Sequence, residues 1–152
     1  MNTANHEYYV SLEVAKLLKE AGFDWEVNHS YPNVSALDNS CSGYMEDLSF
    51  YHNLNDGKYG GLSAPTLEIT QRWLREEKGI YIGITAIENK RAVTNSDGWT
   101  FHYEYDKPTF DCDIQDERCE NMCTLDDSFD TYEEALEVGI KKALEIILDK
   151  GE

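Results

Sequence analysis

Apolar residues recur at three- and four-residue steps in two segments of the N-terminal half, the spacing of an amphipathic helix. The first helix is predicted to begin after the N-cap residue Ser11 and to end at Gly22. The second is predicted over about 65–78, with Pro65 in its first turn and Gly79 ending it. The residues expected to be buried on these helices are Leu12, Ala15, Leu18, Leu67, Thr70, Trp73 and Leu74.

The clearest helical pattern lies near the C-terminal end of the chain. Thr131 and Glu134 form a T-x-x-E capping box, which predicts the start of a third helix. Glycine lowers helix stability, so Gly139 in its middle predicts close packing against a sheet. The stripe expected to face inward is Tyr132, Ala135, Leu136, Gly139, Ile140, Ala143, Leu144 and Ile147.

Alternation of side chains predicts strands between the second and third helices. Residues 80–87 are rich in β-branched side chains, and an Asn-Ser-Asp-Gly turn signal separates them from an alternating segment at 99–105. We expect these two strands to pair antiparallel, with weaker strands at 109–114 and near 122–125. Four aromatic residues on one face of the second strand are interpreted as core, under helices: Trp99, Phe101, Tyr103 and Tyr105.

These elements predict an α+β fold, a small antiparallel sheet of three or so strands with helices packed on one face. Residues 1–152 are expected to form a single domain. Residues 26–62 hold polar and glycine clusters and predict a long irregular or loop-rich region, in which 44–54 is either a short strand or a loop. Long loops in compact domains are often functional, so we expect specificity to reside there.

Composition narrows the class of protein. The chain is 41% hydrophobic, too apolar for intrinsic disorder in spite of its net charge of −17. The first residues hold no basic segment followed by an apolar one, so no signal peptide is predicted. No run of 18 apolar residues occurs, so no membrane helix is predicted. We therefore expect a cytoplasmic protein whose four cysteines are reduced thiols.

The negative charge is concentrated in one segment. Residues 104–137 contain 13 acidic and 2 basic residues, a net charge of −11. Such a surface repels phosphate backbones, so direct binding to nucleic acid is not expected. Two interpretations remain open: the charge serves solubility alone, or it forms a docking surface for a basic protein partner. The candidate binding residues for the second interpretation are Asp111, Asp113, Asp116, Glu117 and Glu120.

The same segment does not match a known metal motif. An EF-hand loop starting at Asp111 requires glycine at its sixth position and glutamate at its twelfth, where this chain has Asp116 and Met122. A zinc site at Cys112, Cys119 and Cys123 would take Cys41 or His102 as its fourth ligand. The spacings C-x6-C and C-x3-C lack the paired knuckles of a structural zinc site. We therefore predict no metal and no cofactor.

No recognised catalytic motif occurs in the chain, whether for a serine nucleophile, a zinc protease, a P-loop or a dinucleotide. His102 and Glu104 share a face of the predicted strand 99–105, where an acid–base pair is conceivable. The polar outer face of a half-buried sheet explains the same two residues, and this interpretation is preferred.

Three segments together carry a resemblance to known proteins: YVSLEVAKLLKEAGFDW at 9–25, SAPTLEITQRWLREEKGIYI at 63–82 and FDTYEEALEVGIKKALEIIL at 129–148. They resemble a family of small uncharacterised proteins from phages, prophages and mobile elements of gut Bacteroidales. The resemblance covers somewhat over a third of the chain and rests on helix cores and caps. It implies a cytoplasmic, mobile-element-borne accessory protein, and it supplies no catalytic residue.

Two functional hypotheses follow from the sequence. The favoured one is a non-enzymatic protein whose acidic surface docks on a basic protein. Such a surface can dock by imitating the negative charge of a nucleic acid. The alternative is an enzyme of unrecognised type with a site near His52 and His102. The organised charge and the missing catalytic motifs favour the first.

Overall fold

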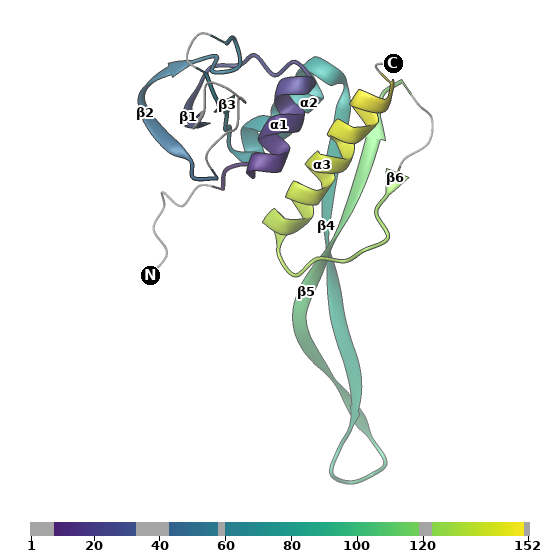
Figure 1. The fold of residues 1–152 in the computed structure, drawn as a ribbon. Helices are drawn as coiled ribbons and strands as arrows, with labels where there is room; N and C mark the ends of the chain where they lie inside the picture. The colour runs from purple at the N-terminus through teal and green to yellow at the C-terminus, as the bar shows by residue number, and fades with distance from the viewer. Residues whose placement is uncertain (1–7, 33–42, 58–59, 119–122, 151–152) are drawn as a thin grey trace.

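The computed structural model describes residues 8–32, 43–57, 60–118 and 123–150. In these ranges three helices and two antiparallel sheets alternate, which confirms the α+β class (Figure 1). None of the described helices combines the length and apolar character needed to cross a membrane. The elements are α1 (Leu12–Glu20), β1 (Val27–Tyr31), β2 (Glu46–His52), β3 (Leu62–Ser63), α2 (Leu67–Lys78), β4 (Ile80–Thr94), β5 (Phe101–Asp116), β6 (Cys123–Thr124) and α3 (Tyr132–Lys150).

The helix ends follow the capping chemistry of the sequence. The hydroxyl oxygens of Ser11, Thr66 and Thr131 accept hydrogen bonds from the backbone N–H groups three residues on, at 3.1–3.3 Å. Gly79 ends α2 in the left-handed conformation, with φ 66°, as its position predicted. Local sequence therefore determines where these helices begin and end.

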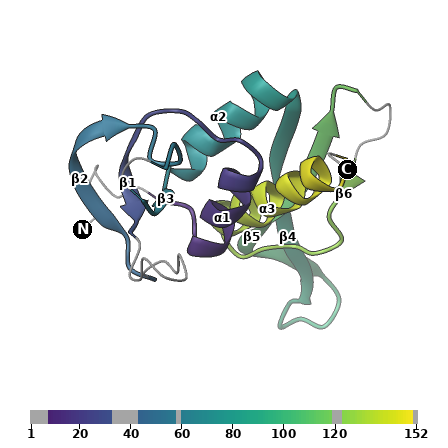
Figure 2. The same cartoon turned by 45° about the horizontal axis from the view of Figure 1, so that its top comes forward.

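The helices lie between the two sheets in both views (Figures 1 and 2). α2 and α3 pack on one face of the β4-β5-β6 sheet, and α1 packs against α3 and β3. Lys141 Nζ on α3 lies 2.9 Å from Glu13 Oε1 on α1. The shared core is fully enclosed, with Trp73, Phe23, Leu18, Leu74, Ile80, Ile114, Ile140 and Leu144 among its buried side chains.

The close contact predicted at Gly139 is confirmed. A Cβ atom on Gly139 would lie 2.5 Å from Cys112 Sγ and 3.0 Å from Ile82 Cγ2. These distances leave no room for a methyl group, so the missing side chain allows α3 to approach β4 and β5. Of the rest of the predicted inward stripe, Tyr132 differs, because its side chain is exposed.

The region 26–62 contains more regular structure than its sequence predicts. Its described parts hold β1, β2 and β3, which form an antiparallel sheet in the order β2-β1-β3. The alternative of an irregular loop at 44–54 is wrong, since Glu46–His52 pairs with β1 as a strand. Residues 33–42 and 58–59 lie outside the described ranges.

The aromatic face predicted as core is the main error of the sequence interpretation. The predicted strands 99–105 and 109–114 form one strand, β5, paired with β4 along a ribbon that projects beyond the helices (Figure 1). The four aromatic side chains lie on this projection and are exposed: Trp99 by 92%, Phe101 by 60%, Tyr103 by 49% and Tyr105 by 63%. Alternation correctly indicated a strand, but not whether a helix covers it.

Candidate functional site

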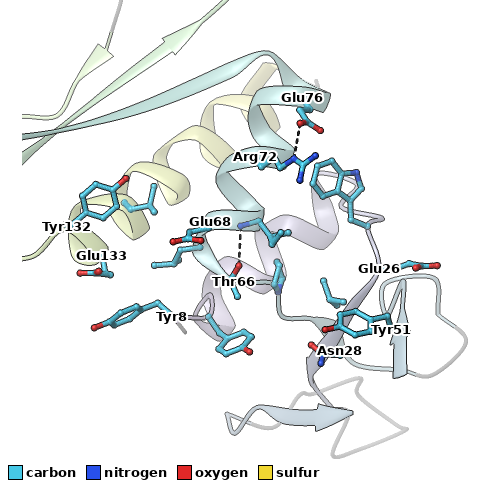
Figure 3. Close-up of a pocket in the computed structure, with 17 residues that line it drawn as sticks. Tyr8, Glu26, Asn28, Tyr51, Thr66, Glu68, Arg72, Glu76, Tyr132 and Glu133 are labelled. Atoms are coloured by element: carbon cyan, nitrogen blue, oxygen red, sulfur yellow. Dashed lines mark hydrogen bonds and ion pairs between the residues drawn. The ribbon is translucent and has the colours of Figure 1, made fainter. Parts of the chain in front are cut away.

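A groove of about 830 Å³ opens beside the first turn of α2, between the β2-β1-β3 sheet and the start of α3 (Figure 3). We call it the tyrosine groove, because four tyrosines from three separate segments line it. Figure 3 shows Tyr132 and Glu133 at one end and Glu26 and Tyr51 at the other. Its principal side chains are Tyr8, Tyr9, Trp25, Glu26, Tyr51, Glu68, Arg72, Glu76, Tyr132 and Glu133.

Backbone hydrogen bonds fix the wall formed by residues 8–10. Leu67 N–H donates to the Tyr8 carbonyl at 2.9 Å, and Val10 N–H donates to the Pro65 carbonyl at 3.0 Å. The hydroxyl of the buried Tyr31 donates to the Val10 carbonyl at 2.7 Å. Burial, followed by the charge of Glu137, raises the pKa of Tyr31, which keeps this hydroxyl a donor. The wall is therefore attached to both α2 and β1.

The rings of the groove present apolar surface to solvent. Tyr8, Tyr51 and Tyr132 are all exposed. The Tyr9 ring stacks on His29, with centroids 4.1 Å apart. Exposed aromatic residues gathered in a hollow are typical of binding sites, because a ligand that covers them gains apolar contact.

The groove is also acidic, with four carboxylates and one guanidinium among its described lining residues. Arg72 Nε lies 2.9 Å from Glu76 Oε1, and its guanidinium lies 5.9 Å from the centre of the Trp25 ring. Arg72 is thus engaged by Glu76 and Trp25. Among the described residues, no lysine or arginine forms an ion pair with Glu26, Glu68 or Glu133.

The helix ends account for part of this arrangement. Glu68 and Glu133 lie in the first turns of α2 and α3, where the helix dipole favours negative side chains. Glu26 precedes β1 and has no such structural reason to be acidic. Three carboxylates around exposed rings form an environment that attracts a cation, through both ion pairs and the negative faces of the rings.

The histidines and cysteines of the described chain lie outside the lining of the groove. No histidine or cysteine belongs to its described lining, so a nucleophile–base pair of the usual kinds is not assembled there. The two histidines of the enzyme hypothesis are not brought together. His52 is in β2, with Nε2 2.7 Å from Asp56 Oδ2, whereas His102 is in β5 of the other sheet, beside Asn95 and Glu104.

The structure divides the acidic residues predicted as a docking surface. Asp111 and Asp113 lie on the face of β5 opposite the helices, and the Ser128 hydroxyl donates to Asp111 at 2.8 Å. Asp116 is buried, with Oδ1 and Oδ2 accepting from Arg118 at 3.0–3.1 Å. Glu117 lies in the turn beside Gly79, and Glu120 lies outside the described residues.

Cys112 and Cys123 are the two cysteines of the proposed zinc site that the structure describes. Cys112 is fully buried beneath Gly139, and burial, followed by the charges of Asp113 and Cys123, raises the pKa of its thiol to about 11. Binding of a metal would require this thiol to lose its proton. Within the described ranges no three His, Cys, Asp or Glu side chains form a cluster able to hold a metal, while Cys41 and Cys119 lie outside them.

Sequence reasoning did not find the tyrosine groove. Its residues come from the segments around 8, 26, 51, 68 and 132, and no motif joins them. The available signals were the Tyr8-Tyr9 pair and acidic residues in two helix first turns, both of which are common in proteins without such a groove.

Comparison with known proteins adds no assignment. No protein-family model, curated protein or solved structure matches this chain. The resemblance to small proteins of Bacteroidales mobile elements therefore stays a prediction.

Proposed function

We propose that this chain is a non-enzymatic binding protein whose tyrosine groove receives a lysine- or arginine-containing segment of a basic partner protein. The observation that carries the proposal is the placement of Glu26, Glu68 and Glu133 around exposed tyrosine rings, without a lysine or arginine paired to them in the described chain. Both features attract the same ligand chemistry, a cation on an aliphatic stem.

The energies involved indicate a multivalent contact. A cation over an exposed ring contributes about 0.5–1 kcal/mol, and an exposed ion pair contributes about 0.2–1 kcal/mol. One side chain in the groove therefore gains only about 1–2 kcal/mol, and useful affinity requires several. The net charge of −17 adds long-range attraction that accelerates encounter with a basic partner.

The groove supports this role better than the acidic run at 111–120. Asp116 is already neutralised by Arg118, so it contributes little to a partner's binding. Asp111 and Asp113 lie on a strand face where their cross-strand neighbours are Thr85 and Gly83, which offer no aromatic ring to a cation. We infer that residues 111–120 contribute to the general negative field, and that contact occurs in the groove.

The test measures binding of a labelled lysine-rich peptide by fluorescence anisotropy to three forms of the protein. The groove variant is Glu68→Gln with Glu133→Gln, and the matched control is Asp111→Asn with Asp113→Asn. Each variant loses two negative charges. We expect the groove variant to bind about tenfold more weakly, a loss of about 1.4 kcal/mol, and the control to change far less.

Equal weakening in the two variants would show that only net charge matters and would overturn the groove as the site. Thermal unfolding of each variant provides the folding control, since removing a first-turn glutamate costs about 0.3–1 kcal/mol of helix stability. A variant that still melts cooperatively near the parent temperature reports on binding alone.

A further inference from the structure

The ribbon of β4 and β5 continues past the helices as a two-stranded arm, defined here as residues 88–107 (Figure 1). The end of the arm is ordered by Asp97, whose carboxylate accepts from the backbone N–H groups of Trp99 and Thr100 at 2.9 Å. These bonds lower the pKa of Asp97. Trp99 is therefore held at the tip of a defined turn with almost all of its surface in solvent.

The aromatic rings of the arm continue the face that α3 covers nearer the helices. Between the pairs Ile87–Thr109 and Asn89–Asp106, β4 has one residue and β5 has two. This bulge shifts the alternation of β5 by one residue. Phe101, Tyr103 and Tyr105 consequently follow Cys112 and Phe110 on the same face of the ribbon, but without a helix above them.

Contacts within the arm confirm that this face is continuous. The Phe101 and Tyr103 rings pack edge to face with centroids 5.6 Å apart, and Lys90 Nζ lies 4.8 Å from the centre of the Tyr103 ring. The opposite face is polar, with Arg91 Nη2 donating to Glu104 Oε2 at 3.0 Å. The arm is thus amphipathic, with one polar face and one aromatic face.

The charge of the arm differs from that of the rest of the chain. The arm holds four acidic and three basic residues, a net charge of −1, so the remaining residues carry −16 of the total −17. Contact between two arms therefore joins the copies at a segment that carries almost none of the negative charge. The eight residues from Glu88 to the turn span about 25 Å, and the Debye length at physiological salt is only about 8 Å. Antiparallel contact of two arms keeps the acidic parts of both copies apart.

The exposed area is sufficient for a dimer. Buried aromatic side chains cover about 150–250 Å² each, so the exposed fractions of Trp99, Phe101, Tyr103 and Tyr105 correspond to about 500 Å² per copy. Two copies provide about 1,000 Å², the lower limit of a specific interface. An uncovered two-stranded ribbon is only marginally stable in water, which adds a reason for the face to be covered.

We propose that the arm is a homodimerisation element, in which the aromatic faces of two arms pack against each other around a two-fold axis. Rings pack well against rings in offset and edge-to-face geometry, so one such face is complementary to itself. High salt screens the repulsion between the acidic parts of the copies, so the dimer strengthens as ionic strength rises. Binding of a cation in the tyrosine groove weakens as ionic strength rises. The two proposals therefore predict opposite responses to salt.

Sedimentation equilibrium of the full chain over a range of concentrations, at low and high sodium chloride, tests the proposal. We expect a monomer–dimer equilibrium that shifts toward dimer at high salt. Tyr103→Ser removes one ring from each copy. We expect the dimer affinity to fall about tenfold for each ring lost, and so about a hundredfold for the dimer. The matched control Val93→Ser changes an apolar residue on the opposite face and leaves the dimer intact.

Acrylamide quenching of Trp99, taken as the difference between the parent and Trp99→Phe, should fall as dimer forms. A chain that stays monomeric at every concentration and salt overturns the proposal, as does a dimer that Tyr103→Ser and Val93→Ser weaken equally. Unchanged melting temperatures show that the variants are folded, since the arm lies outside the core. Neither result bears on the tyrosine groove, whose test uses a peptide.

Discussion

Replacing Gly139 with alanine tests the packing of α3 on the sheet most sharply, because two effects of opposite sign compete. In an open helix position alanine stabilises by about 1 kcal/mol over glycine. Here the new Cβ would lie 2.5 Å from Cys112 Sγ and 3.0 Å from Ile82 Cγ2. Overpacking of this kind costs about 1–3 kcal/mol. We therefore expect a net loss of about 1 kcal/mol, which corresponds to a fall of about 2–4 °C in Tm.

A double-mutant cycle with Cys112→Ala isolates the contact. This second change removes the nearest atom, so Gly139→Ala should recover most of its helix-propensity gain in that background. The expected coupling is about 1–2 kcal/mol, with some strain remaining against Ile82. Urea unfolding followed by circular dichroism gives the free energies, provided the m-value is unchanged.

Val138→Ala is the control for this cycle, since Val138 lies on the exposed side of the same helix. It should show no coupling to Cys112→Ala. If Gly139→Ala stabilises the parent protein by the full propensity difference, α3 does not approach the sheet closely at this residue.

Three further predictions concern stability and metal content. Ala143 is completely buried, so Ala143→Asp places an unpaired charge in the core and should abolish cooperative thermal unfolding, whereas Val138→Asp should not. Burial raises the pKa of the Cys112 thiol from 9.0 to about 11, so the unfolded chain loses this proton at a lower pH than the folded one. Urea titrations should therefore show the free energy of unfolding falling by up to about 3 kcal/mol between these two pH values. The fall should be smaller in Cys112→Ala. Elemental analysis should find no stoichiometric zinc; one zinc per chain, lost when Cys119 and Cys123 become serine, would contradict this.

Local chemistry made the helices predictable. The caps at Ser11 and Thr131, and the stop at Gly79, depend on hydrogen bonds and backbone conformations within a few residues. The close approach at Gly139 also followed from local reasoning, because a glycine inside an otherwise strong helix requires a packing explanation.

The sheet was less predictable, because its shape depends on distant residues. The predicted strand ends at 87, where polar residues begin. The observed strand β4 continues through these residues to Thr94, because its partner β5 supplies hydrogen bonds there. The aromatic alternation at 99–105 has the same period whether α3 covers the face or solvent does, and only the length of α3 relative to the ribbon decides this.

The tyrosine groove lay beyond sequence reasoning for a different reason. It forms where residues 8–10, β1, β2 and the first turns of two helices meet, and the arrangement of two sheets around the helices determines that meeting. The acidic run at 111–120 was visible as sequence, yet pairing with Arg118 and strand alternation direct its members to different places.

Mapping a bound basic peptide by NMR tests whether the tyrosine groove is the binding site. We expect a lysine-rich peptide to shift the Trp25 indole resonance and the backbone resonances of Glu68 and Tyr132, with the effect fading as salt is added. Shifts centred on Asp111 and Asp113, or none at a peptide concentration that binds, would contradict it.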